Sequence, residues 1–159
     1  MKRLSPGNMP AFSPDGKLVM FSSSGRGATI KFDGTERKLL DGSGWGVQLS
    51  PNGKLVAFGS GGNVAILDVR TNERKLILTG DAANRFSYVT YNMGWSRDSN
   101  RVCFQGPNRL TKKTEIAIAN VDGSPDGFQV LYESETAING DFSWHPDGNR
   151  ILFSMNSAK

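Results

Sequence analysis

The residues that could carry out catalysis are few, and nothing in their spacing brings them together. The only histidine is His145 and the only cysteine is Cys103. Nucleophilic hydrolysis needs a serine or cysteine beside a histidine that an acidic residue orients. The motif Gly-x-Ser-x-Gly, typical of α/β-hydrolases, does not occur in the sequence. We therefore expect no catalytic residue in this chain and no enzyme activity of its own, while a larger enzyme that includes the chain stays open.

Residue types that bind metals and cofactors are similarly sparse. A structural zinc site takes four nitrogen or sulfur ligands, which one histidine and one cysteine cannot supply. Asn120, Asp122 and Asp126 lie around Gly123, but they do not follow the spacing of a calcium-binding EF-hand loop, and a tight turn accounts for them. No phosphate-binding loop of the Walker type occurs in the sequence. The sequence therefore predicts neither a bound metal nor a cofactor.

The charge and hydropathy of the chain argue against two further classes of partner. Nineteen Lys and Arg against 15 Asp and Glu give a net charge of +4, but the basic residues occur singly or in pairs rather than in a cluster. No apolar run approaches the roughly 18 residues that suggest a membrane span. Leu-Ser-Pro-Gly at residues 4–7 follows the basic start, where a signal peptide would have its apolar stretch. We expect no nucleic-acid partner, no membrane span and no signal peptide.

An internal repeat dominates the 159 residues. Each copy begins with a large apolar residue, continues with a turn similar to Ser-Pro-Asp-Gly, and ends with a strand similar to Lys-Leu-Val-x-Phe. The turn positions Gly16, Gly53, Ser99 and Gly148 lie 37, 46 and 49 residues apart, a period typical of propeller blades. The third copy has Arg97 in place of proline and Ser99 in place of glycine, so its turn is expected to differ. The four copies are residues 12–21, 49–58, 95–104 and 144–153.

Each copy predicts two antiparallel strands, because Asp-Gly and Asn-Gly pairs supply the positive φ of a tight hairpin. After the turn, two apolar residues stand two positions apart, so they should share one buried face and form the core between successive sheets. A second hairpin follows in three copies, which gives four strands to a unit. Such units at this period favour a β-propeller over a sandwich, because the repeat is present in the sequence itself. The predicted core pairs are Val19/Phe21, Val56/Phe58, Val102/Phe104 and Ile151/Phe153.

The Ser-Pro-Asp-Gly-Lys-Leu-Val-x-Phe units, each followed by a second hairpin, make residues 9–155 resemble the WD-like repeats of TolB-type β-propellers. The resemblance implies an all-β fold, a partial β-propeller of four-stranded antiparallel blades. Propellers of this family serve as protein-binding platforms and as accessory domains of prolyl-oligopeptidase-type hydrolases and Tricorn-like proteases. The resemblance also favours the periplasm or cell envelope, whereas the expected lack of a signal peptide opposes it, so the compartment stays open.

On this interpretation the chain is a single incomplete propeller over residues 1–159. Its blades lie near 9–41, 45–79 and 91–134, and a half-blade lies near 140–155. Complete propellers typically have four to eight blades. Open sheet edges and uncovered apolar faces promote association, because their backbone groups and side chains lack partners. We therefore expect either part of a longer propeller or self-association through the open blade edges.

Long loops gather at one end of the predicted blades, at residues 22–28, 80–91, 105–114 and 133–140. Loops on a rigid scaffold commonly carry binding sites. Aromatic residues and arginine are also enriched at binding hot spots. The alternative is that these aromatic residues fill blade junctions and the basic residues are merely solvated. The candidate interaction surface consists of Trp45, Arg85, Phe86, Tyr88, Tyr91, Arg109, Lys112 and Lys113.

Together these features predict a non-catalytic propeller segment that acts as a scaffold for a protein or peptide partner. The alternative function is an accessory domain that gates or presents substrate to a prolyl-oligopeptidase-type or polysaccharide-active enzyme. A catalytic domain elsewhere in the same polypeptide would favour that alternative.

Overall fold

The computed structural model describes residues 4–43, 46–90, 93–136 and 140–154. These residues form antiparallel β-sheets, as the repeat predicts. The helical elements within them are two 3₁₀ turns of three residues each, η1 (Gly80–Ala82) and η2 (Pro125–Gly127). The fold is therefore all-β.

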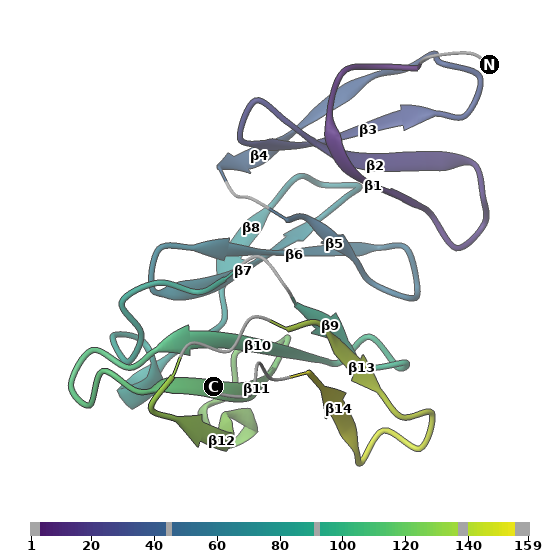
Figure 1. The fold of residues 1–159 in the computed structure, drawn as a ribbon. Helices are drawn as coiled ribbons and strands as arrows, with labels where there is room; N and C mark the ends of the chain where they lie inside the picture. Colours follow the sequence, from purple (N-terminus) through teal and green to yellow (C-terminus); the bar gives the residue numbers. More distant parts are fainter. Residues whose placement is uncertain (1–3, 44–45, 91–92, 137–139, 155–159) are drawn as a thin grey trace.

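The strands form three four-stranded sheets and one two-stranded sheet, which we call blades 1 to 4 in chain order. Blade 1 comprises β1 (Asn8–Phe12), β2 (Leu18–Ser23), β3 (Arg26–Lys31) and β4 (Lys38–Ser43). Blade 2 comprises β5 (Gln48–Leu49), β6 (Leu55–Ser60), β7 (Asn63–Asp68) and β8 (Arg74–Leu76). Blade 3 comprises β9 (Gly94–Trp95), β10 (Arg101–Pro107), β11 (Thr114–Asn120) and β12 (Gln129–Ser134). Blade 4 comprises β13 (Phe142–Trp144) and β14 (Ile151–Phe153), and Figure 1 shows it beside β9.

The predicted second hairpin is present in blades 1, 2 and 3. The third and fourth strands of each blade pair in the same register, with a leucine or valine opposite an alanine. In blades 2 and 3 this alanine packs in the core shared with the preceding blade, whereas in blade 1 it lies on the outer face. The paired residues are Ala28 and Leu39, Ala65 and Leu76, and Ala117 and Val130.

A buried serine explains the repeated turn between the first two strands of a blade. In blade 2 the Ser50 hydroxyl donates to Asn52 Oδ1 at 2.7 Å and accepts the amide of Leu55 at 3.0 Å. Blade 1 repeats both bonds through Ser13, Asp15 and Leu18. Asp15 accepts hydrogen bonds from the Ser13 hydroxyl and from the amide of Lys17. These bonds, the first more than the second, hold the pKa of Asp15 below its ordinary value. The serine thus joins both sides of the turn, which is why this residue type recurs.

The turn of the third copy does not differ in backbone conformation, contrary to the prediction from Ser99. Ser99 adopts a φ of 63°, close to the 69° of Gly16 and the 72° of Gly53. Its hydroxyl accepts the amide of Asn52 from blade 2 at 3.1 Å. This contact between blades offsets the strain of a left-handed non-glycine residue.

We expect Ser50→Ala to lower the free energy of unfolding by about 1–3 kcal/mol, because it leaves a buried amide without its acceptor. Ser50 is 0 % exposed. Chemical denaturation measures the loss. The control is Ser143→Ala at an exposed position of β13, which should change stability by less than about 0.5 kcal/mol. Equal effects of the two substitutions would show that the hydroxyl of Ser50 does not hold the turn.

The core lies between successive blades. Val56 and Phe58 of β6 pack with Met20 of blade 1, and Val102 and Phe104 of β10 pack with Ala57 of blade 2. These two predicted core pairs are therefore buried between blades. The pair in blade 4, Ile151 and Phe153, packs on Cys103 of β10, whereas Val19 and Phe21 lie on the outer face of blade 1 with Leu4. The second strand of each blade thus directs its Val/Phe pair away from the following blade.

Candidate interaction surface

Two long segments at the junction of blades 2 and 3 pair with each other. The segment after η1 runs antiparallel to the end of β10, where Phe86 and Asn108 form a β-bridge. The Ser87 amide donates to the Pro107 carbonyl at 2.9 Å, and the Arg109 amide donates to the Arg85 carbonyl at 2.8 Å. Six of the predicted surface residues lie on these segments: Arg85, Phe86, Tyr88, Arg109, Lys112 and Lys113. The other two, Trp45 and Tyr91, fall outside the described residues.

Phe86 does not belong to an exposed surface, and its prediction as a contact residue is wrong. Its side chain is 0 % exposed and lies in the core cluster between blades 2 and 3. The ring meets Phe104 edge-on at 5.5 Å between centroids and Phe128 at 6.3 Å. Edge-on aromatic pairs of this kind stabilise beyond their buried area. Phe86 therefore anchors the loop that carries its neighbours.

Arg85 is half-buried and holds the same loop through a bidentate ion pair. Its Nε lies 2.6 Å from Glu115 Oε2, and its Nη2 lies 2.9 Å from Glu115 Oε1. Glu115 is 0 % exposed and also accepts the side-chain amide of Asn108 at 2.7 Å. The hydrogen bond to Glu115 raises the pKa of Arg85. The two paired segments and β11 are thus tied at one buried carboxylate.

Two glycines allow the loop to lie between the blades. A Cβ at Gly62 would stand 2.2 Å from the carbonyl oxygen of Phe86, and one at Gly106 would stand 2.3 Å from that of Tyr88. No side chain fits at either position without moving backbone. The loop therefore contacts blade 2 on one side and blade 3 on the other.

The exposed side chains of the paired segments are both apolar and cationic. Tyr88 is 56 % exposed and Leu110 is 90 % exposed, while Arg109 and Lys112 are also exposed. Lys113 differs, because its Nζ lies 3.0 Å from Glu135 Oε1 and that pair raises its pKa. We call the exposed set, Tyr88, Arg109, Leu110 and Lys112, the long-loop surface.

Sequence reasoning missed Leu110, Glu115 and Asn108. Leu110 stands at a tight turn in which Asn108 Oδ1 accepts the amides of Leu110 and Thr111. The signal for Glu115 is its place in a strand of alternating residues, on the same face as Ala117 and Ala119. A charged residue on an apolar face predicts a buried ion pair.

The only histidine and the only cysteine of the sequence lie on different blades, His145 in the turn of blade 4 and Cys103 buried in β10. His145 occupies the turn position of the repeated serines, where its Nδ1 lies 3.0 Å from Asp147 Oδ2. Burial raises the pKa of Cys103 to about 12, which disfavours the reactive thiolate. Among the described residues there is no group of three or more His, Cys, Asp or Glu that could hold a metal ion. Nor do those residues include a helix long and apolar enough to cross a membrane.

Comparison with solved structures identifies the architecture. A protein described as TolB, from Agrobacterium tumefaciens, superimposes with a TM-score of 0.67 at 15 % identity, over 98 % of this chain and 61 % of its own. The chain has the fold of β-propeller blades. The propeller domain of the trilobed protease from Pyrococcus furiosus gives a TM-score of 0.59 at 18 % identity, over 95 % and 48 % of the two chains.

A chain of the mitotic checkpoint complex gives a TM-score of 0.64 at 17 % identity, over 92 % of this propeller segment and 42 % of its own length. The segment therefore spans at most about three fifths of these structures. No protein-family model and no curated protein matches the sequence. At such low identity the likeness establishes the propeller fold alone.

Proposed function

We propose that this propeller segment is a non-catalytic scaffold that binds a protein or peptide through the long-loop surface. The observation that carries the proposal is the presentation of exposed Tyr88 and Leu110 on segments held by Phe86 and the Arg85–Glu115 pair. A large apolar side chain that is 90 % exposed on a restrained loop contributes binding free energy without a large ordering cost.

The charges of the long-loop surface favour an acidic partner. Within the described residues, Arg109 donates to the Phe86 carbonyl and Lys112 donates to the Arg109 carbonyl, and neither forms an ion pair with a carboxylate. Arg85 and Lys113, in contrast, already have glutamate partners. The matching ligand is a peptide segment with an apolar side chain beside one or two carboxylates.

Selection of displayed random peptides on the immobilised protein tests this function. Binders should combine apolar and acidic residues, and Leu110→Asp should weaken their binding by about tenfold or more, because it removes the apolar contact and repels the carboxylates. Leu152→Asp, at another exposed leucine on blade 4, is the matched control and should leave the affinity unchanged. Failure to select peptides, or binders that tolerate Leu110→Asp, would contradict the proposal.

A second candidate is an accessory propeller of an enzyme, which gates or presents substrate. It is favoured by the likeness to the propeller domain of the trilobed protease. Under this proposal the long-loop surface would face a catalytic domain rather than a free peptide. Finding a hydrolase domain in the same polypeptide would support this candidate over the first.

A further inference from the structure

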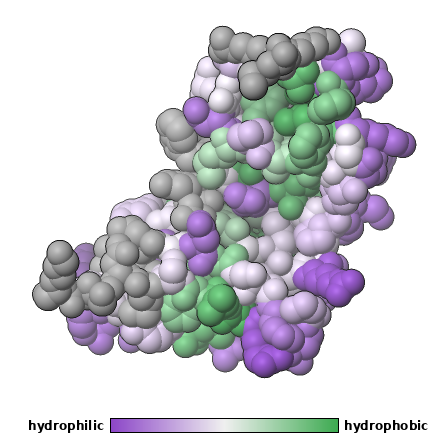
Figure 2. Space-filling model, turned by 45° about the vertical axis from the view of Figure 1, so that its right-hand side comes forward, coloured by the Kyte–Doolittle hydropathy of each residue, from purple (hydrophilic) through white to green (hydrophobic). Residues whose placement is uncertain are grey.

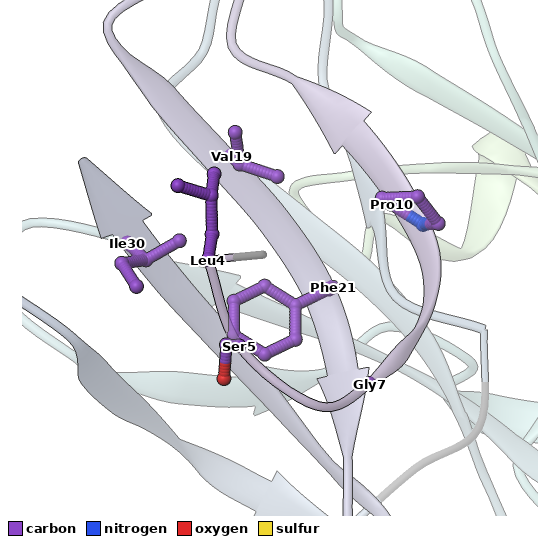
Figure 3. A pocket seen from close by; sticks show the side chains of 7 residues that line it. All are labelled: Leu4, Ser5, Gly7, Pro10, Val19, Phe21 and Ile30. Carbon is purple, nitrogen blue, oxygen red and sulfur yellow. The ribbon is translucent and has the colours of Figure 1, made fainter. Parts of the chain in front are cut away.

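The outer face of blade 1 carries an apolar pocket of about 170 Å³. Figure 3 shows the segment that begins at Leu4 crossing the sheet, with Val19, Phe21 and Ile30 beneath it. Figure 2 shows a hydrophobic area at the height of blade 1 in Figure 1, and a separate, smaller one near the bottom of the molecule. The residues lining the pocket are Leu4, Ser5, Gly7, Pro10, Val19, Phe21 and Ile30.

The repeat shows what occupies the corresponding place in the other blades. Val56 and Phe58, the counterparts of Val19 and Phe21, pack with Met20 from the middle of the second strand of blade 1. In blade 3 the counterparts pack with Ala57 from blade 2, and in blade 4 they pack with Cys103 from blade 3. In blades 2, 3 and 4 the pair therefore packs, among other side chains, with the residue at the Met20 position of the preceding blade.

Two more apolar side chains of blade 1, Phe12 and Phe32, are exposed at positions that are bonded to the preceding blade or buried in other blades. The indole Nε1 of Trp95 donates to the Gln48 carbonyl of blade 2 at 2.9 Å, and that of Trp144 donates to the Gly94 carbonyl of blade 3 at 3.0 Å. Phe12, at the corresponding position of blade 1, is 62 % exposed. Phe32 is 61 % exposed, whereas its counterpart Val121 is 8 % exposed. The face of blade 1 thus has the residue pattern of a blade interface.

Blade 4 presents the complementary residue. Leu152 is the counterpart of Met20, Ala57 and Cys103, which are 2 %, 0 % and 0 % exposed. Leu152 itself is 75 % exposed. One chain therefore displays both halves of a blade interface on two different faces: an apolar pocket and the side chain that the repeat places in such a pocket.

We propose that two copies of this chain associate end to end, with Leu152 of each copy entering the pocket between the segment at residues 4–10 and the outer face of blade 1 of the other. The occupant is a second copy, because the same sequence supplies the pocket and the side chain that fits it. Such a contact joins unlike faces, and two copies close a ring when it forms twice around a two-fold axis. The second contact is then intramolecular, which strengthens a pair of small contacts.

Light scattering coupled to size exclusion over a dilution series tests this arrangement. The wild-type chain should have twice the 17.3 kDa mass of one copy at high concentration. Leu152→Asp should give the single-copy mass throughout, with a wild-type circular dichroism spectrum because the position is exposed. Leu110→Asp is the matched control and should remain dimeric, so loss of peptide binding and loss of association are distinguishable. A wild-type chain that stays at 17.3 kDa, or a Leu152→Asp chain that stays dimeric, would overturn the proposal.

Mixing two variants tests whether each contact joins the outer face of blade 1 in one copy to blade 4 in the other. Phe32→Asp places a charge on the outer face of blade 1, so it should prevent association alone, as Leu152→Asp does. Mixed together, the two variants should recover a dimer, because one of the two contacts in the mixed ring carries neither substitution. A contact between like faces would carry a substitution in every pairing, so an absence of recovery would overturn the end-to-end geometry.

Discussion

Replacing Arg85 by methionine should lower the free energy of unfolding by about 3–5 kcal/mol, because it leaves a buried carboxylate without its cation. Glu115 is 0 % exposed, and after the substitution Asn108 would be the side chain still bonded to its carboxylate among the described residues. The loss should appear in urea denaturation as a lower midpoint. Peptide binding should weaken as well, since the segment that carries Tyr88 loses an anchor.

Two further variants separate the buried charge from the arginine itself. Arg109→Met removes an exposed guanidinium that bonds to a carbonyl, and should cost less than about 1 kcal/mol. Arg85→Met combined with Glu115→Leu removes both charges and should recover much of the stability lost in Arg85→Met, because apolar replacement of a buried ion pair is often neutral. If Arg85→Met alone costs no more than Arg109→Met, Glu115 is not held by Arg85.

Phe104→Ala should cost about 3–5 kcal/mol, the usual range for truncating a fully buried phenylalanine. Phe104 is 0 % exposed and packs edge-on against Phe86 at the junction of blades 2 and 3. The substitution leaves a cavity beneath the segment that carries Tyr88. Chemical denaturation should therefore show lower stability, and the affinity for the selected peptides should fall. Leu76→Ala, at a 47 % exposed position outside the proposed association face, is the control and should change stability by less than about 1 kcal/mol. Similar losses for both residues would place the core elsewhere.

The sheets could be predicted from sequence because their signals are local. A turn of Ser, Asp and Gly followed by alternating apolar residues specifies a hairpin without knowledge of the rest of the fold. The repeat then extends this inference to every blade. Ser99 shows the limit of turn chemistry, since a contact from Asn52 in another blade helps to maintain a conformation for which glycine is the usual residue.

The loop at the junction of blades 2 and 3 could not be predicted from local signals. Phe86 and Tyr88 are aromatic residues two positions apart in one polar segment, yet the first is buried and the second is 56 % exposed. Their difference depends on Phe104 and Phe128, which lie far along the chain. Tertiary packing therefore decided which member of the predicted surface became an anchor and which stayed exposed.

Amide hydrogen exchange of the paired segments tests most directly the central claim that the stacked blades hold the long-loop surface in place. The amides of Ser87, Thr90 and Arg109 donate to backbone carbonyls across the pairing at 2.8–3.0 Å. Because releasing them requires the loop to leave both blades, they should exchange as slowly as the amides within β10 and β11, and Arg85→Met should accelerate them. Exchange at the rate of unstructured peptide in the wild-type chain would show a mobile loop and would contradict the account.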